Sequence, residues 1–171
     1  MNQKWNFDAA HSELKFKVKH MMISTVTGGF DQLELDVQSS DDTFSEAKVV
    51  MKAQTASINT GNADRDNHLK AGDFFDAENH PAILFESTKF DGKTLVGSLT
   101  IKGISKEVTF DVDFGGVGQD PWGNVKAGFS LNGKINRKDF GLEWNVALET
   151  GGILVGEEVK FEAEIQLTKV Q

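Results

Sequence analysis

Apolar and polar residues alternate along most of this chain, with the period of two that half-buried β-strands show. Between residues 14 and 20, Leu14, Phe16, Val18 and His20 occupy one face, and three lysines occupy the other. The same alternation recurs further along the chain, at residues 33–37, 47–51, 83–85, 95–101, 108–114, 125–131 and 159–167. The pattern therefore predicts about eight strands, each with one dry and one charged face.

Short turns join the predicted strands. Asp91-Gly92, between Phe90 and Lys93, is a strong hairpin signal because both turn positions tolerate a positive φ. Gly115-Gly-Val-Gly118 is predicted to be a further loop, and not a phosphate cradle, since no helix follows it. Short connections favour an antiparallel sandwich or barrel. A barrel of about eight strands closes either around its own side chains or around one small ligand.

The segment from residue 57 to residue 75 breaks the alternation. It gathers charges of both signs in Asp64-Arg65-Asp66 and ends on Phe74-Phe75. Asn62 is a favoured helix-capping residue, so a short helical segment is predicted near residues 62–78. A polar and aromatic interruption in a sheet protein indicates a lid or rim over a site.

Length and charge narrow the classes of function. The 171 residues are compatible with a single domain, residues 1–171, with one sizeable core. The net charge of −8 argues against a nucleic acid or an anionic membrane as the main partner. No run approaches the ~18 apolar residues of a membrane span, so no integral membrane segment is expected.

The N-terminal residues bear on the compartment. They include one lysine and no apolar stretch, so no secretory signal is visible. The chain as given is expected to be cytoplasmic, or periplasmic if a leader was removed.

The aromatic residues are unusual, with 13 Phe, 3 Trp and no Tyr. Without a phenol to orient a polar ligand, any cavity is expected to be apolar. Trp122 and Trp144 are expected to be packing residues or to lie at the mouth of such a cavity. One interpretation is that the Phe residues simply fill the core. The other is a tunnel, with room left beside small inward residues such as Gly97, Ala127 and Ala163.

Several short motifs occur in a definite order. They are Asp8-Ala-Ala-His11-Ser12 leading into Phe16-Lys-Val18-Lys-His20, Ser57-Ile-Asn-Thr60, Arg65-Asp66-x-His68-Leu69, Asp73-Phe74-Phe75-Asp76, His80-Pro81-x4-Glu86-Ser87, Gly97-Ser-Leu99-Thr-Ile101-Lys-Gly103 and Ile135-Asn-Arg137-Lys-Asp-Phe140-Gly141-Leu142. In this order and spacing the chain resembles the YceI-like family, the lipocalin-type polyisoprenoid-binding proteins, over nearly its whole length. The resemblance implies a mainly β fold, an extended eight-stranded antiparallel lipocalin-like β-barrel with a small helical segment at one side. It also implies a long apolar tunnel for an isoprenoid or other long-chain lipid, and a homodimer.

The candidate ligand-binding residues are inward apolar side chains together with residues of the interrupting segment. They are Phe16, Val18, His20, Phe30, Arg65, His68, Phe74, Phe75, Phe85, Phe110, Phe129, Phe140 and Trp144. Arg65 and His68 are the candidates for contact with a polar head group, since an arginine fork suits phosphate oxygens. The competing interpretation is that Asp64, Asp66 or a distant carboxylate holds Arg65, which then only braces the segment.

The resulting expectation is a non-catalytic carrier, store or sensor of a long-chain isoprenoid-like lipid. No catalytic residue, metal or cofactor is expected other than the bound lipid. One alternative is a metal-assisted hydrolase that uses the carboxylates and histidines of residues 64–80. Another is a stress-linked interaction protein with a filled barrel. Asp8, His11 and Ser12 are the residue types of a catalytic triad, but no nucleophile elbow surrounds them, and Ser12 is expected to bond nearby backbone.

Overall fold

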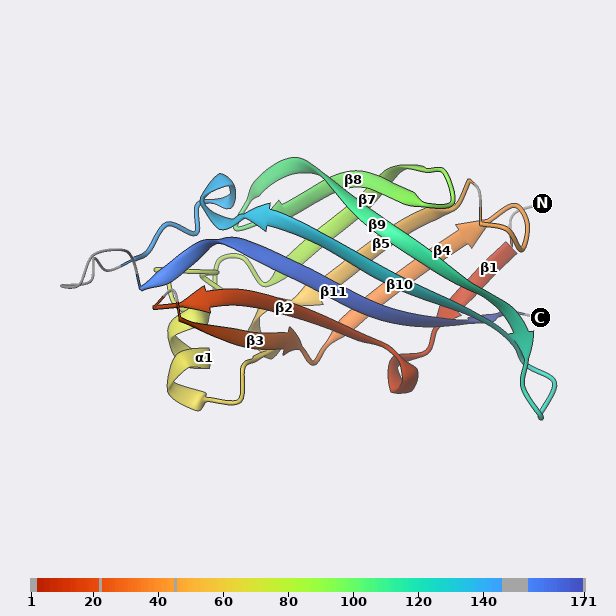
Figure 1. Ribbon diagram of the computed structural model, residues 1–171, viewed down its shortest axis with the longest axis horizontal. Coiled ribbons are helices and arrows are strands. Elements are labelled where there is room, and N and C mark those ends of the chain that lie inside the picture. The colour runs from red at the N-terminus through yellow and green to blue at the C-terminus, as the bar shows by residue number, and fades with distance from the viewer. Residues whose placement is uncertain (1–2, 22, 45, 146–153, 171) are drawn as a thin grey trace.

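Antiparallel strands dominate the computed structural model, which describes residues 3–21, 23–44, 46–145 and 154–170 (Figure 1). The strands are β1 Gln3–Phe7, β2 Glu13–His20, β3 Ser24–Phe30, β4 Leu33–Ser39, β5 Lys48–Gln54, β6 Ile58–Asn59, β7 Ala82–Phe90, β8 Thr94–Ile101, β9 Ile104–Gln119, β10 Val125–Asn136 and β11 Val155–Lys169. The helices are α1 Ala63–Lys70 and three 3₁₀ turns, η1 Ala9–His11, η2 Thr55–Ser57 and η3 Arg137–Phe140. No helix among the described residues has the length and apolar character needed to cross a membrane.

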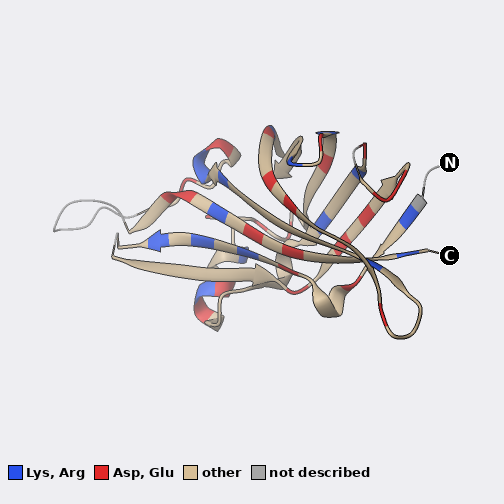
Figure 2. Ribbon diagram, turned by 45° about the vertical axis from the view of Figure 1, so that its right-hand side comes forward, with Lys and Arg blue, Asp and Glu red and all other residues tan. Residues whose placement is uncertain are grey.

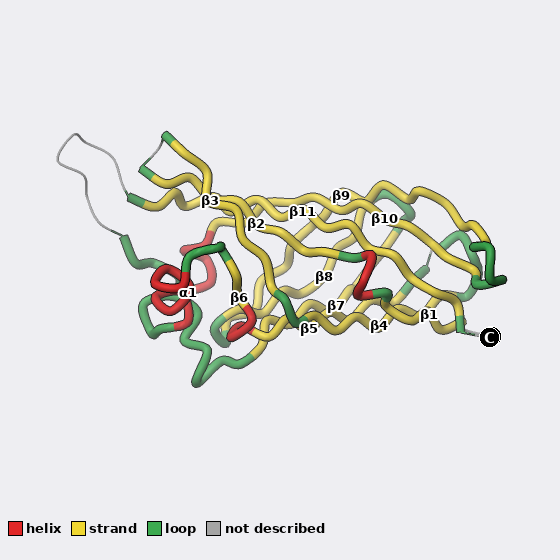
Figure 3. The backbone as a smooth tube through the Cα atoms, turned by 90° about the horizontal axis from the view of Figure 1, so that it is seen from below, coloured by secondary structure: helices red, strands yellow, loops and turns green. Residues whose placement is uncertain are grey.

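The strands close into an elongated barrel. The sheet order is β1-β4-β5-β7-β8-β9-β10-β11, and β1 pairs with β11 to complete the ring. The remaining strands, β2, β3 and β6, extend strands of this ring along the barrel. β1 leads through η1 into β2, β3 leads into β4, and β5 leads through η2 into β6, so each pair forms one wall position. The ring therefore has eight wall strands, three of them interrupted, and the prediction of an eight-stranded antiparallel barrel is confirmed (Figure 3).

The alternation of side chains along the strands separates a dry interior from a charged exterior. In β8, every second residue from Leu95 to Ile101 is buried. Lysines and carboxylates are spread along the strands (Figure 2), and those of β9, at Lys106, Glu107, Asp111 and Asp113, are exposed. Burying one Phe or Leu side chain is worth roughly 1.5–3 kcal/mol, so the inward faces supply much of the barrel's stability.

One end of the barrel is filled by aromatic rings. Phe44, from the loop after β4, lies 4.8 Å from Trp5 and 4.9 Å from Phe129 between ring centroids. Phe129 stacks on Phe114 at 4.8 Å. Trp5 and Phe44 are each only 1% exposed, so this end of the interior is closed.

Helix α1 lies at the opposite end of the barrel, next to β6 (Figures 1 and 3). The side chain of Asn62 accepts a hydrogen bond from the backbone of Arg65 at 3.0 Å, which satisfies a free N–H at the helix start. The prediction of a short helix capped by Asn62 is confirmed. No residue of α1 is fully buried, so the helix lies against the barrel rather than inside it.

Two local predictions were wrong. Gly115–Gly118 was expected to be a loop but lies within β9, where the register shifts opposite Gly128 and Phe129 and Gly116 adopts φ +105°. The hydroxyl of Ser12 does not bond to backbone that is close to it in sequence. It accepts a hydrogen bond from the backbone N–H of Gln166 on β11 at 2.9 Å and so joins the two ends of the chain.

Candidate ligand-binding cavity

An apolar cavity of about 490 Å³ occupies the α1 end of the barrel. Its volume lies within the ~300–1,000 Å³ range of small-molecule sites in proteins. Its walls come from eight strands, β2, β3, β5 and β7 to β11, and are formed by Leu14, Phe16, Val18, Val26, Phe30, Met51, Ala53, Ile83, Leu99, Ile101, Phe110, Ile135, Val155, Val159 and Phe161. The filled-barrel interpretation is therefore wrong for this end of the molecule, although it describes the Trp5 end.

The cavity is polar only where α1 and the ends of β2 and β10 approach it. The polar side chains there are those of Lys19, His20, Asn62, Asp64, Arg65, His68 and Arg137. Three of these are permanent cations and one is a carboxylate, in a chain whose net charge is −8. This polar end is the mouth of the cavity. Its net charge has the opposite sign from that of the protein as a whole, which favours an anionic or electron-rich group there.

Aromatic rings hold the rim of the cavity together. The His68 ring meets Trp144 edge to face, with centroids 4.7 Å apart, and meets Phe74 at 5.1 Å. Its Nε2 lies 3.2 Å from a carboxylate oxygen of Asp73. Phe75 packs against Phe30 at 6.0 Å. Helix α1 and the residues after it are therefore fixed to the barrel by ring packing, as the prediction of a rim requires.

Arg65 is bound to Thr60 rather than to a carboxylate. Its Nε donates to the Thr60 hydroxyl and its Nη2 donates to the Thr60 carbonyl, both at 2.7 Å. Asp66 accepts hydrogen bonds from the backbone N–H and the hydroxyl of the same threonine, at 2.9 and 2.6 Å. Thr60 thus ties the segment that leads into α1 to the first turn of the helix, and it holds Arg65 in place without neutralising its charge.

Arg137 was missed as a site residue, although it lines the cavity and is only 3% exposed. Its guanidinium donates to the carbonyls of Gly156, Leu142, Trp144 and Val155, at 2.8, 2.5, 3.0 and 3.2 Å. Within the described part of the chain, no carboxylate lies within ion-pair distance of it. Burial lowers the pKa of Arg137, and the more distant charge of Glu157 opposes that effect.

A sequence signal for Arg137 was present. Ala127, Phe129, Leu131 and Ile135 alternate along β10, and Arg137 continues their phase, two residues beyond Ile135. An arginine in register with the inward positions of a strand is expected to point inward.

Ten of the thirteen predicted binding residues line the cavity. They are Phe16, Val18, His20, Phe30, Arg65, His68, Phe74, Phe75, Phe110 and Trp144. The other three lie elsewhere: Phe85 lines a separate hollow of about 100 Å³, and Phe129 lines one of about 70 Å³. Phe140 is buried in η3 and lines none of these spaces.

The triad-like residues do not assemble as a catalytic unit. The His11 Nδ1 lies 2.9 Å from the Asp8 carboxylate, which also accepts from Lys126 at 3.1 Å. Ser12 bonds instead to the Gln166 backbone. Among the described residues, no group of three or more His, Asp or Glu side chains is arranged to hold a metal ion.

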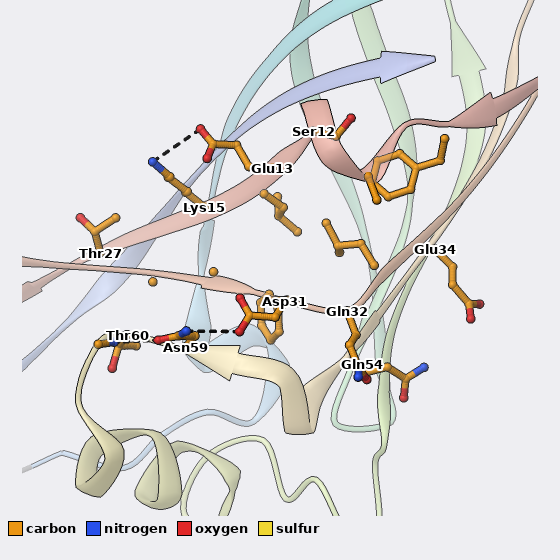
Figure 4. Close-up of a pocket in the computed structure, with 18 residues that line it drawn as sticks. Ser12, Glu13, Lys15, Thr27, Asp31, Gln32, Glu34, Gln54, Asn59 and Thr60 are labelled. Carbon is orange, nitrogen blue, oxygen red and sulfur yellow. Dashed lines mark hydrogen bonds and ion pairs between the residues drawn. The ribbon is translucent and has the colours of Figure 1, made fainter. Parts of the chain in front are cut away.

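A second hollow, of about 850 Å³, is an open groove in the barrel wall (Figure 4). It lies where the pairing of β1 with β4 ends, at Asn6 and Asp36, and before the pairing of β2 with β3 begins, at Lys15 and Gly29. Of its charged side chains, Glu13 pairs with Lys15, and Asp31 accepts a hydrogen bond from the Asn59 side chain. Because the groove is the more polar and the more open of the two, the apolar cavity is the better candidate site for an apolar ligand.

An elongated antiparallel barrel with an apolar cavity and a polar mouth defines a β-barrel of the lipocalin type. The chain belongs to the YceI-like domain family, whose family model matches residues 5–167.

Individual relatives agree with this assignment. A UPF0312 protein of Staphylococcus aureus strain N315 is 46% identical over 165 residues, which is 96% of each chain. A crystal structure of a Campylobacter jejuni YCEI protein matches with a TM-score of 0.74 at 33% identity, over 90% of each chain. A polyisoprenoid binding domain from Saccharophagus degradans matches at 16% identity with a TM-score of 0.66, over 97% of this chain and 98% of that one, and it shows the fold alone.

Proposed function

We propose that this protein binds one long-chain amphiphile of the isoprenoid type and does not transform it chemically. The chain would occupy the apolar cavity and the head group would meet the cationic mouth. The observation that carries this proposal is that one cavity has both apolar walls and a cationic mouth. An amphiphile needs both, the walls for its chain and the mouth for its head group. The structural neighbour from Saccharophagus degradans is a polyisoprenoid binding domain, which supports the class of ligand.

The energetics of burial favour such a ligand. Each methylene removed from water contributes about 0.8 kcal/mol, so three or four isoprene units supply on the order of 10 kcal/mol before ordering costs. The walls provide almost no hydrogen-bonding groups, so the fit of the chain depends on shape.

The head group would be bound at the mouth by Arg65 and His68, with Lys19 and Arg137 contributing positive charge nearby. Arg65 donates two hydrogen bonds to Thr60, and its remaining N–H groups stay available for an oxygen of the ligand. A phosphate or carboxylate suits this arrangement better than a cation does.

Two measurements test the proposal. Mass spectrometry of an organic extract of the purified protein should detect a long-chain amphiphile in near-stoichiometric amount. Isothermal titration with farnesol and farnesyl phosphate should then show binding to the delipidated protein.

A matched pair of variants identifies the site. Val18 lines the cavity, whereas Thr27 is exposed and lines the groove in the wall. Val18→Trp should abolish binding of both probes and Thr27→Trp should leave it unchanged. The opposite result would assign binding to the groove, and an empty extract with no probe bound would refute lipid binding.

A further inference from the structure

Phe110 belongs to the layer of side chains between the cavity and the rest of the barrel interior. It lines both the 490 Å³ cavity and the next hollow, of about 100 Å³, as do Leu14, Met51, Leu99 and Phe161, and it is the aromatic member of this layer that packs on a glycine. A third hollow, of about 70 Å³, follows toward the aromatic rings at the Trp5 end. The interior is thus a row of spaces separated by side chains, with the largest at the mouth.

The position of the Phe110 ring depends on a glycine in the next strand. A Cβ atom on Gly133 would overlap the Phe110 ring and would lie 3.3 Å from the Thr109 carbonyl oxygen. On its other side the ring meets Phe85 edge to face, with centroids 5.5 Å apart. The ring can therefore occupy this position only because residue 133 has no side chain.

The same arrangement occurs twice more. A Cβ on Gly28 would lie 2.6 Å from the Phe16 ring, and a Cβ on Gly97 would lie 2.5 Å from the Phe85 ring. In each case an inward phenylalanine lies over a glycine of the neighbouring strand. These pairs explain how a barrel so rich in phenylalanine keeps an open interior.

We propose that Phe110, seated on Gly133, sets the length of the ligand's apolar chain, an inference that rests on the proposed function. If each methylene takes about the volume of a liquid water molecule, ~30 Å³, the cavity holds roughly 16 carbon atoms, or about three isoprene units. A longer chain has to displace the Phe110 ring before it reaches the next hollow.

The test measures the affinity for a series of all-trans isoprenoid alcohols of increasing length, by competition with a fluorescent probe. In the wild type, affinity rises with chain length and then levels off. Phe110→Ala joins the first two spaces and moves this limit to longer chains. The longest alcohols should gain about tenfold in affinity relative to farnesol, the change expected from burying two further methylene groups.

A substitution that moves the Phe110 ring into the interior should lower the chain length at which affinity levels off. Gly133→Ala pushes the ring of Phe110 toward the interior. Gly128→Ala is the matched control, because Gly128 lies on the same strand and a Cβ there meets nothing within 4 Å. It should leave the length dependence unchanged.

The double variant separates the ring from other effects of the new methyl group. In a Phe110→Ala background there is no ring to displace, so Gly133→Ala should have no further effect on the length limit. A shortened limit in the double variant would refute the role of the ring. If Gly133→Ala does not fold, Phe110→Trp replaces it, with a larger ring and a shorter expected limit.

The two proposals fail in distinguishable ways. If the wild type binds no alcohol of any length, the proposed function itself is refuted. If the wild type binds but Phe110→Ala and the shortening variant share its length dependence, only the role of Phe110 is refuted.

Discussion

Of the residues at the mouth, Arg137 is the one whose replacement should lower the stability of the protein most. Arg137→Met keeps the apolar bulk but leaves the carbonyls of Gly156, Leu142 and Trp144 without this donor, whereas the Val155 carbonyl keeps its hydrogen bond from the Asn145 side chain. Each buried polar group left unpaired costs about 1–3 kcal/mol, so a loss of at least ~3 kcal/mol in the free energy of unfolding is expected. Urea denaturation measures this loss.

The adjacent residue supplies the control for Arg137. Lys138 is exposed and forms a surface ion pair with Glu157 at 2.9 Å. Lys138→Met should cost less than about 1 kcal/mol. Similar losses in the two variants would mean that the carbonyls around Arg137 are satisfied by water in solution.

Asp8 gives the protein a dependence on acid pH. The hydrogen bond with His11 holds the pKa of Asp8 below its ordinary value, with Lys126 adding to the effect and burial opposing it. A carboxyl whose pKa is lower in the folded state contributes stability above its unfolded pKa, and that contribution disappears as the pH falls through the folded value. Wild-type stability should therefore fall below about pH 4, where the unfolded state begins to bind the proton.

The measurement compares thermal unfolding of the wild type, Asp8→Asn and Asp113→Asn between pH 7 and pH 2.5. Asp8→Asn should be less stable than the wild type at pH 7, and the difference should shrink toward pH 2.5. Asp113 is exposed on β9, and its variant should follow the wild-type curve. A constant gap between wild type and Asp8→Asn at every pH would contradict the expected role of this carboxylate.

At the scale of the element, α1 is the part of the molecule that should distinguish head groups. Arg65→Ala removes a charged donor from the mouth, so it should weaken binding of farnesyl phosphate by ~1.5–3 kcal/mol and that of farnesol by much less. Phe75→Ala should weaken both ligands alike, because Phe75 lines the cavity in which the proposed function places the apolar chain that they share. Titration calorimetry of both ligands against each variant measures these differences.

Thr60→Val is the control for the brace between Arg65 and Thr60. It removes the hydroxyl that Arg65 Nε and Asp66 bind but leaves the guanidinium in place. If Thr60→Val reproduces the whole effect of Arg65→Ala, Arg65 acts by holding α1. If Thr60→Val binds both ligands normally, Arg65 acts on the head group directly.

The elements also show how far local sequence patterns determine this fold. Period-two alternation identified the wall strands, and Asn62 identified the start of α1, because both signals depend on neighbouring residues. The partner of Ser12, 154 residues away on β11, and the carbonyls around Arg137 depend on how distant segments meet, which no local pattern encodes. Gly115–Gly118 looked like a loop because glycine disfavours strands, but pairing with β10 retains this stretch in β9.

Trp122 shows that local sequence patterns also fail to place some single side chains. Packing or a place at the mouth was expected of this residue, yet it is 84% exposed in the turn between β9 and β10. Trp144, with the same expectation, does lie at the mouth against His68 and Phe74. Residue type alone could not separate the two tryptophans, because their surroundings differ only in the folded chain.

At the scale of the whole molecule, the barrel is packed at one end and hollow at the other. Trp5, Phe44, Phe114 and Phe129 fill the interior near the chain termini. The cavity of about 490 Å³ lies at the α1 end. The aromatic residues that close one end of the interior are therefore separate from the residues that line the cavity.

The cavity has a consequence for hydrostatic pressure. Unfolding eliminates internal voids, so pressure favours the unfolded chain, usually with a volume change of about 20–100 mL/mol that grows with the void lost. An apolar cavity of this size is poorly hydrated, so the ligand-free protein should lie at or beyond the upper end of that range. Occupying the cavity with farnesol, or filling part of it by Val18→Trp, should make the unfolding volume smaller in magnitude. Tryptophan fluorescence under pressure measures this volume, and an equal value for the empty and filled forms would show that water already fills the cavity.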